Sequence, residues 1–354
     1  MGIQTEKFGV TKEGAVVTKY ILENKNGLKL VLSDLGAVIL ALYLPDRDGV
    51  LEDVSLGFDQ VSDYEVNAPA FGAVIGRVAN RISGAGFTLN GKKYDLDDND
   101  KSNCLHSGFD RYEHKMYEAE CDTGEGQASV SFSRVSPDME QGFPGELTVT
   151  VTYTLNDEDE VMIAYHAVSD ADTVVGFTNH NYFNLGKGGH KCLDVRRQQM
   201  KIFADSYTPV DDILIPTGEI RPVEGTALDF REMHVIGERL GEDAPDEKTV
   251  SGYDHNFVLR NTSGAIGKAA MYQDTKTGRR MEVFTDFPGL QVYSAATLGT
   301  TKGKDGVTYG PFAGICFETQ NFPNAVNQEN FPSPVLRAGE EYERTAVFRF
   351  STFL

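Results

Sequence analysis

The 354-residue sequence contains no tryptophan, only four cysteines and no long apolar run. The cysteines form no CxxC pair, so neither a zinc knuckle nor a thioredoxin-type redox site is expected. Such sparse use suits a reducing compartment, although two disulfides remain an alternative. No apolar run approaches the roughly 18 residues of a membrane span, and the N-terminal residues lack the apolar core of a signal peptide. We therefore expect a cytoplasmic protein with no membrane partner.

Basic residues are scarce relative to acidic ones. The chain has 33 Lys and Arg against 53 Asp and Glu, which gives a net charge of −20. So strong a negative charge repels nucleic-acid phosphates and anionic surfaces, and we expect no nucleic-acid partner. A neutral small molecule is compatible with this charge, whereas a phosphorylated ligand would need a local basic pocket.

Short β-strands separated by turns dominate the hydrophobic pattern. Asn90-Gly91 is the strongest hairpin signal, between residues 87–89 and 92–94. Further strands are predicted at 15–23, 28–33, 147–155, 161–168, 174–177, 282–284, 291–294, 315–318 and 345–350. Helical periodicity is limited to 59–64 and 230–240, and 241–247 is typical of a solvated acidic loop. We expect an all-β, largely antiparallel fold, in which residues 1–354 form a single domain.

Several polar segments contain residue types that can act in catalysis or ligand binding. The Asn-His-Asn run around His180 follows an apolar strand, where its polar groups are costly unless they find partners, as in a cleft. Glu318 ends another apolar strand. Its carboxylate is either buried and positioned for catalysis, or lies where the strand reaches solvent. His106 fits a ligand-binding or a structural loop residue equally well, and Asp254 fits a hydroxyl acceptor or a turn cap.

Other chemistries have weaker support in the sequence. Metal ligation by His106, His180 and Asp254 lacks any HxH, HExxH or paired-His spacing, so no metal is expected. A serine triad lacks a GxSxG elbow, and residues 76–81 lack the context of a nucleotide cradle. A glycosidase that uses Asp254 and Glu318 as its two carboxylates remains open.

Taken together, the ordered segments resemble the aldose 1-epimerase family, also called galactose mutarotases. The most specific are Asn-His-x-Tyr-Phe-Asn-Leu at 179–185 and Glu-Thr-Gln-x-Phe-Pro-Asn at 318–324. The resemblance covers nearly the whole chain. It implies a β-sandwich of the galactose mutarotase-like supersandwich type with an open cleft. It also implies interconversion of the α and β anomers of free hexoses such as glucose and galactose, without metal or cofactor.

The resemblance also implies roles for particular residues. His180 would be the general acid and Glu318 the general base. Hydroxyl groups or the ring oxygen of the monosaccharide would be bound by Asn80, Arg81, His106, Asp254 and Gln291, with Tyr293 offering an aromatic face. The segment after His106 reads Ser-Gly-Phe-Asp-Arg, shorter and less glycine-rich than in the family, which leaves the preferred sugar open. A monomer or weak homodimer is expected.

The acid–base roles carry pKa expectations. A modestly raised pKa would keep His180 a donor at neutral pH, and partial burial would make Glu318 a stronger base.

Two alternatives remain on the same scaffold. A hexose-6-phosphate 1-epimerase would need basic residues at the cleft, for which Arg77 and Lys101 are candidates. A non-catalytic sugar-binding or regulatory module is disfavoured because both His180 and Glu318 are present.

Overall fold

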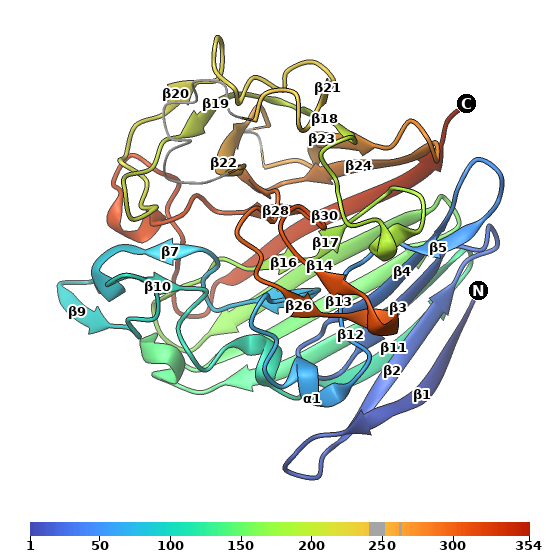
Figure 1. The fold of residues 1–354 in the computed structure, drawn as a ribbon. Helices are drawn as coiled ribbons and strands as arrows, with labels where there is room; N and C mark the ends of the chain where they lie inside the picture. Colours follow the sequence, from blue (N-terminus) through green and yellow to red (C-terminus); the bar gives the residue numbers. More distant parts are fainter. Residues whose placement is uncertain (241–251, 262–263) are drawn as a thin grey trace.

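The structure is a computed structural model that describes residues 1–240, 252–261 and 264–354 (Figure 1). The acidic loop expected at 241–247 lies outside these residues. Strands are the main regular structure of the described chain, which has one short α-helix, α1 (Val61–Tyr64), and single 3-10 turns. These turns lie at Ser83–Ala85, Tyr112–His114, Glu140–Gly142, Gly189–Lys191, Lys304–Gly306 and Ala325–Asn327. No helix in the described ranges is long and apolar enough to cross a membrane.

Three antiparallel sheets form the body of the molecule. The nine-stranded sheet has the order β11 (Glu118–Gly124), β12 (Gln127–Ser136), β13 (Leu147–Asn156), β14 (Glu160–Ser169), β30 (Glu341–Thr352), β24 (Arg279–Thr285), β23 (Gly267–Gln273), β18 (Gln199–Ile202) and β21 (His234–Val235). The six-stranded sheet has the order β17 (Tyr182–Phe183), β28 (Ile315–Gln320), β25 (Gly289–Tyr293), β22 (Asp254–Leu259), β19 (Ala204–Thr208) and β20 (Arg221–Pro222). The five-stranded sheet runs β1 (Gly2–Val10), β2 (Val16–Glu23), β3 (Lys29–Ser33), β4 (Ile39–Pro45) and β5 (Leu51–Asp53).

Five short two-stranded ladders occur beside these sheets in the described chain. Their pairs are β6 (Ala73–Ile75) with β16 (Thr178–His180), β7 (Arg81–Ile82) with β10 (Cys104–Leu105), β8 (Gly86–Leu89) with β9 (Lys92–Asp95), β15 (Thr173–Val174) with β29 (Val335–Leu336), and β26 (Thr301–Lys302) with β27 (Thr308–Tyr309). In Figure 1, β7, β9 and β10 lie together at the left of the molecule, whereas β16 and β28 lie near its centre. Ladders such as that of β6 with β16 therefore join segments that are distant in sequence.

The core lies between the sheets, as strict alternation in the long strands requires. Every second residue of β13 from Leu147 to Leu155 is fully buried, whereas those between are partly exposed. The largest buried cluster joins Val151 of the nine-stranded sheet to Leu32 of the five-stranded and Phe317 of the six-stranded sheet. The fold is thus a large antiparallel β-sandwich, as predicted.

Most predicted strands are confirmed, and two expectations are wrong. The Asn90-Gly91 hairpin is present, with both residues at positive φ (51° and 77°), as a tight turn of this type requires. The expected helix at 230–240 is instead a run of turns around the short strand β21. The strand expected at 174–177 is broken there, and the ladder resumes at Thr178–His180.

Candidate active site

Three neighbouring strands of the six-stranded sheet, β28, β25 and β22, provide the floor of the site. Their register places two rows of residues side by side: Cys316, Tyr293 and Asp254 in one row, and Glu318, Gln291 and Asn256 in the next. Because members of the two rows are two positions apart on each strand, all six side chains lie on the same face. The apolar residues between them, such as Phe317 and Val292, point into the core.

His180 is brought to this floor by the ladder between β16 and β6, where it pairs with Ala73. Its carbonyl accepts the N–H of Gly72 at 3.2 Å. Gly72 has φ +65°, and a Cβ at this position would collide with the carbonyl of Ile39. The neighbouring Asn179 donates to Tyr153 Oη at 3.2 Å, which ties the ladder to the nine-stranded sheet. The backbone of His180 is therefore fixed by the β6 ladder and by the adjacent Asn179.

An adjacent wall is made by the segments around Asn80 and His106, which bond to each other; the ring centroids of His106 and His180 are 5.4 Å apart. The N–H of His106 donates to the carbonyl of Asn80 at 3.0 Å. The N–H of Asn80 in turn donates to His106 Nδ1 at 3.2 Å. Because Nδ1 accepts a hydrogen bond, the proton of the neutral ring is on Nε2, which is left as a donor. Burial, then the charges of His180, Arg111 and Arg81, hold the pKa of His106 well below 6.5, so this ring stays neutral.

These elements enclose a cavity of about 410 Å³. Of the predicted site residues it is lined by His180, Glu318, Asn80, Arg81, His106, Asp254 and Tyr293. Gln291 is buried behind Asp254, to whose Oδ1 its Nε2 donates at 2.6 Å. The structure thus brings together seven of the predicted residues from six separate segments, and the eighth, Gln291, supports Asp254.

Sequence reasoning missed part of the lining. Tyr182, two residues after His180, was within the quoted motif but was not singled out. Arg111 belongs to the unusual segment after His106, so that segment does reach the cavity. Further lining comes from 68–70 and from residues within 297–301, where turn-forming small residues gave no chemical signal.

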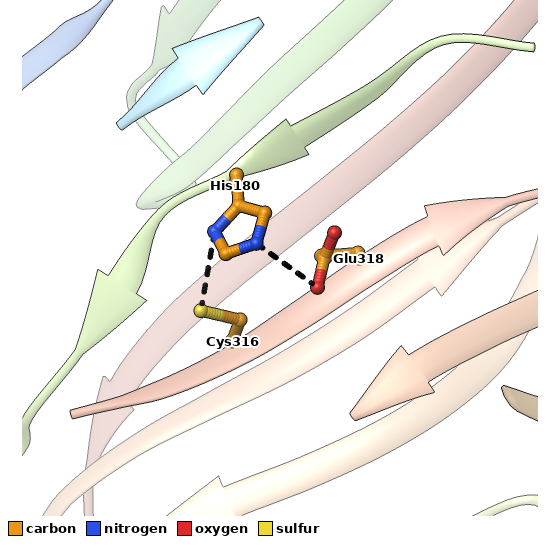
Figure 2. Close-up of side chains that lie close together, drawn as sticks. All are labelled: His180, Cys316 and Glu318. Atoms are coloured by element: carbon orange, nitrogen blue, oxygen red, sulfur yellow. Dashed lines mark hydrogen bonds and ion pairs between the residues drawn. The ribbon is translucent and has the colours of Figure 1, made fainter. Parts of the chain in front are cut away.

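The central feature is the contact between His180 and Glu318, which come from different strands and face each other (Figure 2). His180 Nε2 lies 3.7 Å from Glu318 Oε1. The two residues are only 6% and 2% exposed, and both line the cavity. Glu318 Oε2 has no hydrogen-bond partner among the described residues. An unpartnered buried carboxylate oxygen is costly when charged, so this environment disfavours the ionised form of Glu318.

Burial dominates the electrostatics of this pair. It lowers the pKa of His180 to about 4, with a further contribution from the charge of Arg111, and only the ring's own backbone carbonyl opposes the drop. It raises the pKa of Glu318 well above 4.5, and the nearby carboxylate of Asp254 adds to the rise. The expectation of a raised His180 pKa is therefore wrong, because removal of the imidazolium from water outweighs its partners. The expected direction for Glu318 is confirmed.

The cations of the cavity are held by carboxylates. Arg81 Nε donates to Asp100 Oδ2 at 2.7 Å, and Arg111 Nε lies 2.9 Å from Glu113 Oε1. Arg77, a candidate for phosphate binding, is fully buried elsewhere. Its guanidinium donates to backbone carbonyls of 143–145 and to two side-chain hydroxyls, so its role is structural. Lys101 is exposed and does not line the cavity, so neither candidate supplies the basic pocket.

Three possible metal-ligating side chains lie together at the site: His180, Cys316 and Glu318, with ligand atoms within 4.8 Å of one another. Cys316 Sγ is 3.6 Å from His180 Nδ1, whereas Glu318 is near Nε2. The imidazole therefore stands between the thiol and the carboxylate and meets them through different nitrogens (Figure 2). A metal ion needs ligand atoms that converge on one point, and this arrangement suits proton exchange better.

Comparison with known proteins gives consistent results. Residues 18–349 match the family model described as aldose 1-epimerase. The galactose mutarotase of Mus musculus is 44% identical over 340 residues, which cover 96% of this chain and 95% of the mouse protein. The aldose 1-epimerase of Escherichia coli is 35% identical over 332 residues, 93% of this chain and 94% of that protein.

Solved structures resemble the fold along its whole length. A crystal structure of an aldose epimerase homologue from C. elegans matches with a TM-score of 0.86 and 31% identity, covering 94% of this chain and 98% of that one. The β-sandwich described above is therefore the galactose mutarotase-like fold.

Proposed function

Because this chain belongs to the aldose 1-epimerase family and is an aldose 1-epimerase, we propose that His180 and Glu318 carry out its proton transfers. The observation that carries the proposal is their contact inside the cavity: the imidazole Nε2 and a carboxylate oxygen 3.7 Å apart, both buried. One base and one acid suffice for the reaction, and no metal or cofactor takes part in it. The substrate is a monosaccharide, and we propose a free hexose such as glucose or galactose.

The reaction moves one proton through the sugar. Glu318 accepts the proton of the O1 hydroxyl while Nε2 of protonated His180 gives its proton to the ring oxygen. The bond between C1 and the ring oxygen breaks, and C1=O1 forms. Rotation about C1–C2 presents the other carbonyl face, and the same two groups return their protons as the ring closes. Glu318 lines the cavity, so its carboxylate can receive the proton of the sugar hydroxyl there.

Burial favours the opening step. Before it, the pair holds a carboxylate and an imidazolium; afterwards it holds a carboxylic acid and a neutral imidazole. A buried site disfavours both charges, which is why the pKa of His180 is lowered and that of Glu318 raised. The protonation state of the ring-opened complex is thus also the one that burial favours in the free pair, so the carboxylate–imidazolium state that begins the step is the less populated one.

The remaining residues bind and orient the sugar. The Nε2–H of neutral His106 and the side chains of Asn80 and Arg81 offer donors, and Asp254 offers an acceptor. Gln291 acts by holding Asp254, and Tyr293 contributes an aromatic surface beside His180, at 6.3 Å between ring centroids. We further propose a cytoplasmic enzyme that works as a monomer or weak homodimer, without nucleic-acid or membrane partners.

The test is polarimetry on freshly dissolved α-D-glucose and α-D-galactose. His180→Asn and Glu318→Gln preserve size while removing the transferable proton or the base. Positioned proton transfer contributes on the order of 10²–10⁴-fold, so each variant is expected to lose at least about 100-fold in kcat. Thermal unfolding checks that both variants remain folded.

His190→Asn is the matched control. His190 is also buried, but it bonds to Tyr309 Oη at 3.1 Å and does not line this cavity. This variant is expected to keep the wild-type rate. A rate near wild type in folded His180→Asn or Glu318→Gln would refute the assigned roles.

A further inference from the structure

Cys316 makes a contact with the acid–base pair that the proposed reaction does not use. It lies on β28 two residues before Glu318, so both side chains point to the same face, and its Sγ is 3.6 Å from His180 Nδ1 (Figure 2). The side chain is fully buried and is not among those that line the cavity. The thiol therefore lies behind the imidazole, on the side away from Glu318.

The contact joins a neutral thiol to the ring. Burial, then the charges of Glu318 and Asp254, hold the pKa of Cys316 well above 9, so the group stays an uncharged S–H. Such a sulfur is a weak acceptor as well as a weak donor. It can thus accept the Nδ1–H of an imidazole without the strong preference for imidazolium that a carboxylate in its place would impose.

The acid role of His180 requires one nitrogen to exchange its proton and the other to keep it. If Nε2 gives its proton to the sugar, the neutral ring that remains must hold its proton on Nδ1. That N–H is buried and needs an acceptor. The ring's own backbone carbonyl favours its protonated form, and Nδ1 is the nitrogen nearer the backbone. Sγ of Cys316 is the side-chain atom placed to be the second acceptor.

We propose that Cys316 is a positioning residue: its sulfur accepts the Nδ1–H of His180 and so leaves Nε2 as the nitrogen that gives and takes back the proton. This inference rests on the proposed role of His180. The orienting partner keeps one tautomer, as the buried carboxylate does for the histidine of a serine-protease triad. Here the partner is neutral, so it orients the ring without making Nε2–H a weaker acid.

Kinetics of three variants test the proposal. Cys316→Ala removes the acceptor and is expected to lower kcat about 5-fold to 10-fold, the size of one modest hydrogen bond, with KM unchanged within about 2-fold. Cys316→Ser supplies a hydroxyl that also accepts, and is expected to restore kcat to within about 3-fold of wild type. Cys104→Ala is the control, because Cys104 is the other buried free cysteine and does not touch His180.

A spectroscopic measurement separates orientation from packing. In protein labelled with ¹⁵N-histidine, the two ring nitrogens show which one carries the proton. The signals of His180 are identified among the seven histidines by their loss in His180→Asn. Wild type, Cys104→Ala and Cys316→Ser are expected to show His180 protonated on Nδ1, whereas Cys316→Ala shows a shift toward the Nε2–H tautomer.

Failure of this inference can be distinguished from failure of the proposed function. If His180→Asn is inactive but Cys316→Ala keeps both the wild-type kcat and the Nδ1–H tautomer, Cys316 is only a packing residue. If kcat falls equally in Cys316→Ala and Cys316→Ser with no change of tautomer, the effect is one of shape, and the proposal is likewise wrong. Activity in folded His180→Asn would overturn the acid role itself.

Discussion

At the scale of single residues, the site depends on two titratable groups whose pKa values burial moves in opposite directions. The pKa of His180 is lowered to about 4, and the pKa of Glu318 is raised well above 4.5. Between these two values the pair holds one transferable proton, which is the number that the reaction needs. Below the lower value both groups are protonated and no base remains. Above the higher value both are deprotonated and no acid remains.

This leads to a prediction for the pH profile. The kcat/KM, corrected for the uncatalysed rate, is expected to be bell-shaped, with its acid limb near pH 4 and not near the ordinary histidine value of about 6.5. Because the charge of Asp254 raises the pKa of Glu318, Asp254→Asn is expected to move the basic limb to lower pH and leave the acid limb in place. An acid limb near pH 6.5, or a basic limb that Asp254→Asn leaves unmoved, would contradict this account.

The sequence predicts which residues meet at the site better than it predicts their pKa shifts. The motifs at 179–185 and 318–324 singled out His180 and Glu318, which the fold brings into contact. The direction of the His180 pKa was missed, because the depth of burial of an Asn-His-Asn run is decided by strands far away in sequence. The contact with Cys316 was missed for the same reason, since a pattern within β28 cannot show what packs against it.

At the scale of elements, the antiparallel register of β22, β25 and β28 sets the floor of the site. The sequence predicted strands at the positions of β25 and β28, but not β22. It also did not predict that β28 would pair with β25 and β25 with β22, because register between distant strands is fixed by tertiary packing. Asp254 and Gln291 are diagonal neighbours across β22 and β25, and they hydrogen-bond at 2.6 Å. This cross-strand contact gives Asp254 its orientation.

A cross-strand pair of variants tests this arrangement. Asp254→Ala removes the acceptor itself and is expected to raise KM about 10-fold or more, the cost of one hydrogen bond to a charged group. Gln291→Leu keeps Asp254 but removes the hydrogen bond that orients its carboxylate. We therefore expect a smaller rise in KM, with little change in kcat. Because Gln291 lowers the pKa of Asp254, its loss should also raise that pKa and weaken binding as pH falls. Michaelis–Menten measurements at two pH values check both. An unchanged KM in Asp254→Ala would make Asp254 a turn residue only.

At the scale of the whole molecule, charge decides between free and phosphorylated sugars. The chain carries a net charge of −20, and two carboxylates, Asp254 and Glu318, line the cavity. The cavity's two arginines are each held by a carboxylate, Arg81 by Asp100 and Arg111 by Glu113. Burial raises the pKa of Glu113 to about 7, so the second pair is fully ionised only above that pH. The composition indicated this preference, whereas the pairing of the arginines needed the structure.

We therefore expect discrimination against a phosphate at C6. The test is made at pH 8, where Glu113 is ionised. The kcat/KM for glucose 6-phosphate should then be at least about 10-fold below that for glucose. The reason is that a group of about −2 charge meets a negative field, and among the described residues no unpaired cation lines the cavity. Added salt shortens the screening length from about 10 Å at 0.1 M to about 3 Å at 1 M. It should therefore reduce the difference in kcat/KM between the two sugars and leave the kcat/KM for glucose unchanged. 6-O-Methylglucose separates size from charge, since it is bulky at C6 but neutral, and it should follow glucose and show no salt dependence. Equal rejection of both derivatives would mean that the cavity selects by shape, and faster turnover of the phosphate would identify a hexose-6-phosphate epimerase instead.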